Sequence, residues 1–237
     1  MRSNFWERFK GAALVVVLGY LGAVALLSLC GLFVVHVVAH SSVGHADVSI
    51  SRSLSHHRTP RLNNVTQVLS WSADTIGAVA LAMVASIVLA LRRLWRYIVM
   101  LVVGLGFELA TFLLVNHVVN RPRPHVAHLG SLPFTSSFPS GHVAATFVIY
   151  ACVALFVRAE TRSSILRSLS VLAAVVMPLA VAVARVYRGM HYPLDTLGGL
   201  LLGAITVAVV FTAFDRGTAN ADAKAPSIDD HILKAVA

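Results

Sequence analysis

The chain has 237 residues, of which 57% are hydrophobic and only 12% are charged, and its mean hydropathy is +0.79. Soluble domains carry about 25% charged and about 45–50% apolar residues, and the core of a globule this size cannot hide so much apolar surface. This composition argues against a soluble domain and against a disordered chain. The net charge of +9 comes from basic residues at the ends of apolar segments, as in membrane proteins.

Six apolar segments are long enough to cross a bilayer, which takes about 20 residues in a helix. In chain order they cover 11–38, 75–91, 97–118, 141–157, 168–186 and 194–214. They lack the alternation of a barrel strand, and a span must pair its backbone internally, so we expect helices. The first resembles a signal peptide, but its apolar run exceeds the roughly 7–15 residues of such a signal, so we expect a membrane anchor.

The connection from 40 to 74 is long and polar. Its apolar residues, among them Ile50, Leu54 and Leu62, recur loosely at helical spacing. This spacing favours a helix in the membrane interface, and an irregular cap is the alternative. We therefore expect an all-α, polytopic membrane protein, with six transmembrane helices in a bundle over 1–215 and a polar, mobile cytoplasmic tail over 216–237.

Basic residues in the connections predict the orientation of this bundle. Of the 19 Lys and Arg residues, twelve lie on the side of both termini. The other seven are Arg52, Arg58, Arg61, Arg121, Arg123, Arg185 and Arg188. The positive-inside rule places the side with twelve, and both termini, in the cytoplasm.

Three polar stretches, at 120–125, 138–142 and 185–195, fall on the predicted extracytoplasmic side. The first and third contain Arg123 and Arg185. A guanidinium group matches the oxygens of a phosphate and keeps its charge at a membrane boundary. Either arginine alone can instead extend toward lipid headgroups, as interfacial arginines commonly do.

The second stretch reads Pro139-Ser140-Gly141-His142 and predicts the start of the fourth helix at the proline. Free N–H groups and the positive end of the helix dipole favour an anion there, and glycine permits its close approach. His142 can give or take a proton near neutral pH. The alternative is a helix start with an incidental histidine.

The third stretch ends with His191, Pro193 and Asp195, and the proline predicts that the sixth helix begins there. A carboxylate beside an imidazole fixes its tautomer and leaves the other nitrogen free to attack. Attack on phosphorus would give a phosphohistidine, with arginines holding the oxygens. The alternative is a histidine that caps a helix, beside a structural aspartate.

Taken in order, these residues resemble the type-2 phosphatidic acid phosphatase superfamily, membrane lipid phosphatases related to vanadium haloperoxidases. Arg123-Pro124 ends the first motif of that family, and Pro139-Ser140-Gly141-His142 matches the second in full. Arg185, His191 and Asp195 match the third motif at the right spacing. The resemblance covers residues 75–215.

The resemblance implies that His191 is the nucleophile, that Asp195 orients it, and that His142 protonates the leaving oxygen and later activates water. It implies that the phosphoryl oxygens are held by Arg123, Arg185, Ser140 and Gly141. The family requires no metal or other cofactor. The predicted outer loops carry no carboxylate cluster or Cys/His ligand set, which agrees with that implication.

Two positions depart from the family pattern, since Asn116 replaces a motif lysine and Ala184 replaces a motif serine. If this position contacts the phosphate, replacing the lysine ammonium by the asparagine amide exchanges a charge-assisted hydrogen bond of about 1.5–3 kcal/mol for a neutral one of about 0.5–1.5 kcal/mol. Rate or substrate choice would then differ. His117 or Arg121, being close in sequence, is a candidate for the missing charge.

Two features inside the predicted spans have structural interpretations. Glu108 is an ionisable residue in the third span, and an ionisable residue inside a membrane span is usually first considered as a functional residue. A carboxyl group that is hydrogen-bonded across helices or kept protonated is the interpretation we favour. Gly199 and Gly203 form a small-residue pair that permits close helix packing.

These expectations describe a hydrolase of a bacterial plasma membrane that acts on lipid phosphates at the outer leaflet. Its substrate would be a phosphomonoester or pyrophosphate on a lipid, such as a polyprenyl pyrophosphate or a phosphatidate. Its partners would be membrane lipids and not nucleic acid. The alternatives are a lipid phosphotransferase and a catalytically weak binder or transporter of lipid phosphates.

Overall fold

The computed structural model describes residues 2–222, with side chains from 10 to 214. Over these residues the chain is helical and contains no strand. The helices are α1 (Arg2–His36), the short 3-10 helix η1 (Val38–His40), α2 (Ser42–His56), α3 (Pro60–Ser72), α4 (Thr75–Leu91), α5 (Trp95–Val119), α6 (Gly141–Glu160), α7 (Ser164–Tyr187) and α8 (Pro193–Asp222).

The prediction of an all-helical membrane bundle is confirmed. Within the described residues, five helices (α1, α5, α6, α7 and α8) are long and apolar enough to cross a membrane. The predicted second span corresponds to α4, which reaches that length only together with α3, and the two are bent by 58° at their junction. Counting this bent pair as one span gives six.

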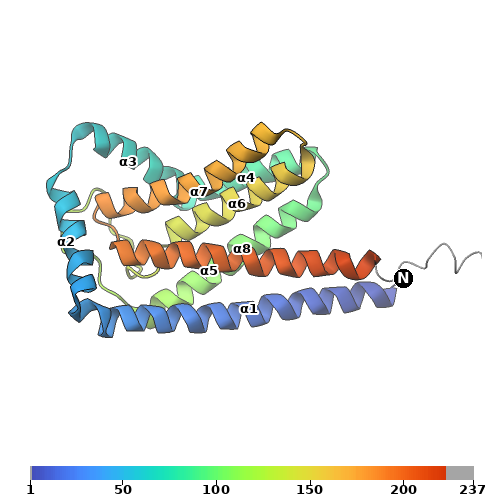
Figure 1. The fold of residues 1–237 in the computed structure, drawn as a ribbon, viewed down its shortest axis with the longest axis horizontal. Coiled ribbons are helices and arrows are strands. Elements are labelled where there is room, and N and C mark those ends of the chain that lie inside the picture. Colours follow the sequence, from blue (N-terminus) through green and yellow to red (C-terminus); the bar gives the residue numbers. More distant parts are fainter. Residues whose placement is uncertain (1, 223–237) are drawn as a thin grey trace, which may run out of the picture.

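The bundle has two distinct ends (Figure 1). Helices α1 and α8 lie side by side, and the start of α1 lies near the end of α8. At the opposite end α2 lies across the bundle, close to where α1 ends and α8 begins. We call this the α2 end.

The connection from 40 to 74 forms the two helices α2 and α3. Of the two alternatives predicted for it, the helical one is therefore observed and the irregular cap is not. Each of these helices has a side-chain cap: Ser41 Oγ accepts from Gly44 N, and Thr59 Oγ1 accepts from Leu62 N. Pro60 opens α3, at a position where a missing N–H costs no helical hydrogen bond. The pair forms a cover over the α2 end.

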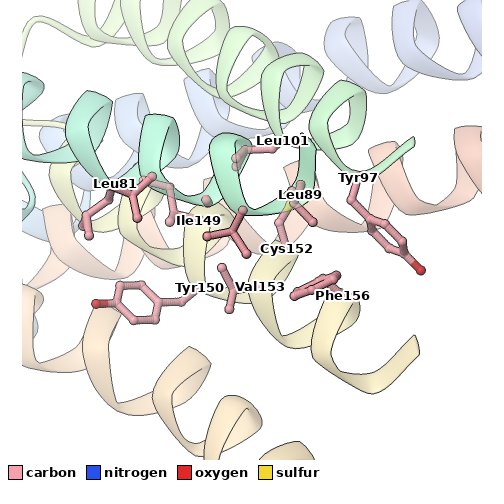
Figure 2. A pocket seen from close by; sticks show the side chains of 12 residues that line it. Leu81, Leu89, Tyr97, Leu101, Ile149, Tyr150, Cys152, Val153 and Phe156 are labelled. Atoms are coloured by element: carbon pink, nitrogen blue, oxygen red, sulfur yellow. The ribbon is translucent and has the colours of Figure 1, made fainter. Parts of the chain in front are cut away.

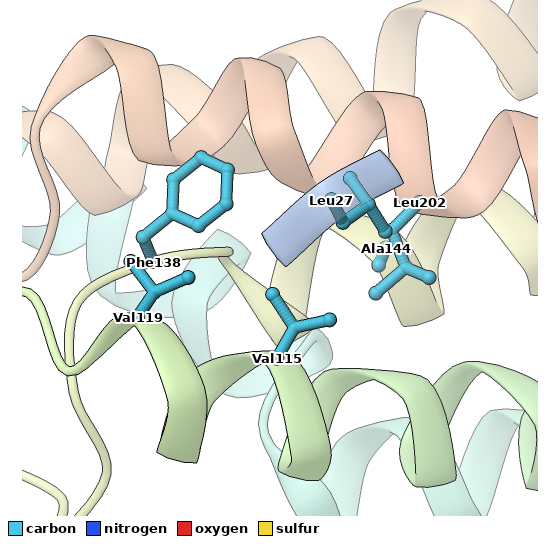
Figure 3. Close-up of a cluster of buried hydrophobic side chains, with 6 residues drawn as sticks. All are labelled: Leu27, Val115, Val119, Phe138, Ala144 and Leu202. Carbon is cyan, nitrogen blue, oxygen red and sulfur yellow. The ribbon is translucent and has the colours of Figure 1, made fainter. Parts of the chain in front are cut away.

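A cluster of apolar side chains joins α1, α5, α6 and α8 (Figure 3). Its buried members are Leu27, Val115, Val119, Phe138, Ala144 and Leu202. Phe138 belongs to the loop before α6, and its ring packs where α8 has Gly198: a Cβ on that glycine would lie 2.5 Å from the ring. The loop that carries the Pro-Ser-Gly-His motif is therefore anchored in the core.

Close helix contact fixes the start of α6. A Cβ atom on Gly199 would lie 2.4 Å from the Ser140 carbonyl oxygen, and one on Gly203 would lie 2.6 Å from Phe147 Cβ. The expected packing role of this glycine pair is confirmed. Helix α6 begins at Gly141 with Ser140 as its N-cap, two positions later than predicted, whereas α8 begins at Pro193 as predicted.

An apolar groove of about 280 Å³ lies between α4, α5 and α6 (Figure 2). Its lining includes Leu81, Leu101, Val153 and Phe156, and it contains none of the predicted site residues. At the other end of the chain, α8 continues to Asp222, past the predicted start of the tail at 216. Residues 223–237 of that tail lie outside the described residues.

Candidate active site

The three polar stretches meet at the α2 end, because α5 and α7 end there and α6 and α8 begin there. Asn120 closes α5 in the left-handed conformation (φ 45°), which asparagine adopts more readily than most residues. Gly189 follows α7 with φ 77°, and a Cβ there would lie 2.9 Å from the Ala127 carbonyl oxygen. The loop after α5 therefore folds directly against the loop that carries His191.

His191 is buried, and its two ring nitrogens face different partners. Nδ1 lies 2.7 Å from the Ser137 carbonyl oxygen, which can only accept, so Nδ1 carries the proton and donates it. Nε2 therefore carries the lone pair of the neutral ring, and it accepts a long hydrogen bond of 3.5 Å from Arg123 Nη1. This is the tautomer that a nucleophilic Nε2 requires.

Burial lowers the pKa of His191 well below its usual value, and the positive charges of Arg185, Arg123 and His142 lower it further. The hydrogen bond to Ser137 opposes this shift. His191 is therefore neutral at physiological pH. Of these positively charged groups, Arg123 is in direct contact with the ring.

Arg123 is held by the loops that precede α6 and α8. Its guanidinium donates to the carbonyl oxygens of Thr135 (3.2 Å), Ser136 (3.1 Å) and Met190 (2.6 Å) and to Thr135 Oγ1. Burial lowers its pKa, and Asp195 partly offsets this effect. These contacts hold the planar group beside the free nitrogen of His191.

Arg185 reaches the same region from the last turn of α7. Its side chain is buried, and Nη1 donates to Ser70 Oγ of α3 at 2.8 Å. Its Nε and the Oγ of Ser140 are buried atoms without a hydrogen-bond partner among the described residues. Buried polar atoms are rarely left so, and each such atom needs a specific explanation.

His142 lies on the first turn of α6, next to Gly141. The first N–H groups of a helix have no acceptor within it, so this turn presents backbone donors at the α2 end. Ser140 N donates to the Asp195 carbonyl oxygen at 3.0 Å, which joins the start of α6 to the start of α8. Four predicted residues, Ser140, Gly141, His142 and Asp195, are thus brought together.

Asp195 lies close to His191, but the expected direct hydrogen bond to the imidazole is replaced by another contact. Asp195 Oδ2 is 3.9 Å from His191 Nδ1, beyond hydrogen-bond distance. Ser137 provides the acceptor for the ring, and its hydroxyl donates to Asp195 Oδ2. The carboxylate also accepts from Tyr192 N at 2.8 Å. Ser137 therefore connects the two residues, and the sequence analysis did not identify it.

Asn116 has a different position from the expected phosphate contact. Its Oδ1 accepts from Ser136 N (2.8 Å), and its Nδ2 donates to the carbonyl oxygens of Ser136 (2.9 Å) and Phe138 (3.2 Å). The Ser136 hydroxyl donates to the backbone oxygen of Asn116. The amide is used to hold the loop before α6.

The candidates for the missing lysine charge also lie elsewhere. Arg121 pairs with Asp195 (2.5 Å) and with Asp47 of α2 (2.7 Å), and its guanidinium packs over the Tyr192 ring at 4.3 Å. His117 is exposed on α5.

Glu108 is buried in α5, and its Oε1 has no partner among the described residues, so a hydrogen bond across helices is not seen at that atom.

Comparison with known proteins identifies relatives of this chain. The family model described as PAP2 superfamily matches residues 93–219. Phosphatidylglycerophosphatase B of Bacillus subtilis (strain 168) is 28% identical over 172 residues, covering 72% of this chain and 84% of that protein. The putative undecaprenyl-diphosphatase YbjG of Escherichia coli (strain K12) is 32% identical over 113 residues, covering 44% of this chain and 52% of that protein.

Two solved structures share the fold. The crystal structure of a transmembrane PAP2-type phosphatidylglycerolphosphate phosphatase from Bacillus subtilis superimposes with a TM-score of 0.68 at 24% identity, covering 83% of this chain and 92% of that one. The crystal structure of Aquifex aeolicus LpxE gives a TM-score of 0.55 at 22% identity, covering 69% and 93%. The membrane bundle described above is thus a known architecture.

Proposed function

The chain belongs to the PAP2 superfamily and is a membrane lipid phosphatase, and from this premise we propose that it acts through a phosphohistidine on His191. The observation that carries the proposal is the state of the imidazole. Nδ1 donates to the Ser137 carbonyl oxygen, and Nε2 keeps its lone pair, which accepts only a long hydrogen bond of 3.5 Å from Arg123 Nη1. A neutral ring with one nitrogen committed presents the other as a nucleophile.

In the first step, the Nε2 lone pair of His191 attacks phosphorus and forms a P–N bond. The bond between phosphorus and its leaving oxygen breaks, which is the ester oxygen of a phosphomonoester or the bridging oxygen of a pyrophosphate, and that oxygen takes a proton from His142. In the second step, water attacks phosphorus while His142 takes one of its protons. The P–N bond breaks, inorganic phosphate leaves, and both histidines return to their starting states.

Charge develops on the phosphoryl oxygens in both steps, and preorganised donors are the main source of stabilisation for such charge. Arg123 and Arg185 supply guanidinium donors, and the first turn of α6 at Gly141 supplies backbone N–H groups. The unpartnered Arg185 Nε and Ser140 Oγ are the buried donors that a phosphoryl oxygen would satisfy. Asn116 takes no part in this set, because its amide bonds the loop.

The substrate we propose is a phosphomonoester or pyrophosphate on a membrane lipid. The relatives are named for phosphatidylglycerophosphate, whose terminal group is a phosphomonoester, and for undecaprenyl diphosphate, which is a pyrophosphate. Phosphatidate is also a phosphomonoester on a glycerolipid. A site where helices end at one face of the bundle suits a lipid whose headgroup lies at the interface. The excess of Lys and Arg on the opposite side supports an extracytoplasmic site, with both termini in the cytoplasm.

The test is phosphate release by the detergent-purified protein with three substrates: phosphatidylglycerophosphate, undecaprenyl diphosphate and phosphatidate. We expect His191→Ala to abolish release, and His117→Ala, at an exposed histidine of α5, to leave it unchanged. Rapid quenching of the wild-type protein with a substrate labelled at the transferred phosphorus should trap label on the protein, and His191→Ala should trap none. Full activity of His191→Ala would reject the nucleophile.

The same assay separates the proposal from its two rivals. Hydrolysis in water enriched in oxygen-18 places the heavy isotope in the released phosphate, whereas a phosphotransferase passes the group to a lipid or sugar acceptor. A binder or transporter would retain vanadate, which mimics the five-coordinate phosphorus, without releasing phosphate from any of the three lipids.

A further inference from the structure

A buried aspartate of α2 reaches into the network around the active site. Asp47 is only 3% exposed, and its Oδ2 lies 2.7 Å from Arg121 Nη2. Its Oδ1 accepts from the backbone N–H of Leu194 at 2.9 Å. The other terminal nitrogen of Arg121 lies 2.5 Å from Asp195 Oδ1. One guanidinium therefore bridges a carboxylate from α2 and a carboxylate from α8.

We propose that Asp47 is a positioning residue for the reaction, which acts through Arg121 and the first turn of α8 to hold Asp195 beside His191. The proposal rests on the function proposed above. Asp47 lies outside residues 93–219, which the family model matches, so its role follows from the contacts alone.

The contact with Leu194 supplies one half of this role. Leu194 lies in the first turn of α8, where N–H groups have no acceptor within the helix. A carboxylate at this position satisfies one of them and is favoured by the helix dipole. Asp47 thus caps α8 from a neighbouring helix, one residue before Asp195.

The contact with Arg121 supplies the other half. A buried guanidinium between two carboxylates divides its charge between them, and both ion pairs constrain its plane. Without Asp47, Arg121 would pair with Asp195 alone and would be free to pull it away from Ser137 and Tyr192. The negative charge of Asp195 would then be less available to the imidazolium that forms when His191 is phosphorylated.

A purely structural role is the alternative, in which Asp47 only holds the α2–α3 cover against the bundle. Arg58 provides the matched control, because it ties the same cover to the bundle through other groups. Its guanidinium donates to the carbonyl oxygens of Tyr187 (3.1 and 3.0 Å) and Ala127 (2.8 Å). Loss of Arg58 should therefore loosen the cover without altering the pairing of Asp195.

The experiment compares Asp47→Asn, Asp47→Glu and Arg58→Met in detergent, with the fastest of the three lipid substrates. We expect Asp47→Asn to lower kcat by about 10- to 100-fold, as for a misplacement of about 1 Å, and to change KM by less than about twofold. Asp47→Glu restores the charge and should recover most of kcat. Arg58→Met should lower Tm as much as Asp47→Asn does, with kcat close to wild type.

The proposal is overturned if kcat of Asp47→Asn equals that of wild type, or if it falls only as far as that of Arg58→Met at equal loss of Tm. Should Asp47→Asn fail to fold, Arg121→Lys makes the same test, because an ammonium cannot span both carboxylates as the planar fork does. His191→Ala is measured in parallel. Activity that survives in His191→Ala rejects the proposed function, whereas His191-dependent activity that is indifferent to Asp47 rejects only this inference.

Discussion

The carbonyl oxygen of Ser137 accepts the hydrogen bond from His191 Nδ1 at 2.7 Å, at the position where an aspartate was expected. Ser137 is fully buried, and its backbone N–H donates to the Arg121 carbonyl oxygen at 2.8 Å. A backbone oxygen is fixed by the chain on both sides, so it holds the imidazole tautomer more rigidly than a rotatable carboxylate. Asp195 then acts on the ring through space and through the Ser137 hydroxyl.

Replacing Ser137 by alanine should separate these two contributions. The carbonyl oxygen remains, so the tautomer of His191 is kept, but the hydrogen bond to the Asp195 carboxylate is lost. Such a bond contributes about 1.5–3 kcal/mol, so we expect kcat to fall by about tenfold or more, in contrast to the complete loss in His191→Ala. Ser49→Ala, at an exposed serine with a local hydrogen bond to Ala46, is the control and should be neutral.

The lowered pKa of His191 predicts how stability depends on pH. The unfolded chain takes up a proton at this histidine below its ordinary pKa of about 6.5, whereas the folded protein does not. The unfolded state then binds more protons at low pH. The contribution of His191 to the free energy of unfolding is therefore fully present above pH 6.5 and is lost as the pH falls below it. Tm in detergent at pH 7.5 and pH 5 should show a steeper loss for wild type than for His191→Asn. Equal slopes would contradict the shift.

Restoring the motif lysine should damage this protein. Asn116→Lys brings back the family residue, but an ammonium cannot accept from Ser136 N or reproduce the paired contacts of the amide. Each neutral hydrogen bond contributes about 0.5–1.5 kcal/mol, so we expect a lower Tm and a slower kcat from a loosened loop before α6. The control is His117→Lys, which places the same charge on the exposed neighbouring position. A gain of activity in Asn116→Lys would show that the position binds phosphate after all.

A methyl group at Gly199 should disturb the first turn of α6, where we propose that phosphate binds. The added Cβ would lie 2.4 Å from the Ser140 carbonyl oxygen, a backbone atom, so α8 and the start of α6 must move apart. We expect a lower Tm and a raised KM for lipid phosphate. Gly106→Ala in α5 is the matched control, since nothing lies within 4 Å of its Cβ and alanine favours a helix by about 1 kcal/mol. Equal behaviour of the two variants would refute the packing argument.

The fold followed from the sequence because hydropathy and helix-end residues are local signals. Long apolar segments predicted the spanning helices, and Pro193 marked the start of α8. The motif residues from three loops were assigned to one side by loop charge alone, and in the structure Arg123 contacts His191, whose pKa is lowered by the charges of Arg185 and His142 as well. The second span was harder to define, because its length depends on the bent junction between α3 and α4.

The supporting residues could not be predicted in the same way. Asp47 and Ser70 lie in a polar connection, where an aspartate or a serine is normally solvated, and only the packing of α2 and α3 onto the bundle buries them. Ser137 contributes a carbonyl oxygen, which every residue has, so its side chain gave no signal. Asn116 stands where the family motif has lysine, but its amide bonds the loop before α6.

The α2–α3 cover bears on which part of the chain a catalytic fragment needs. Ser70 holds Arg185, and Asp47 holds Arg121 and the start of α8, although both precede the stretch that is recognisable as PAP2. A fragment cut at the start of α5 would keep every motif side chain and still lack these two buried contacts. We therefore expect a fragment of this chain to need α2 and α3 for full activity.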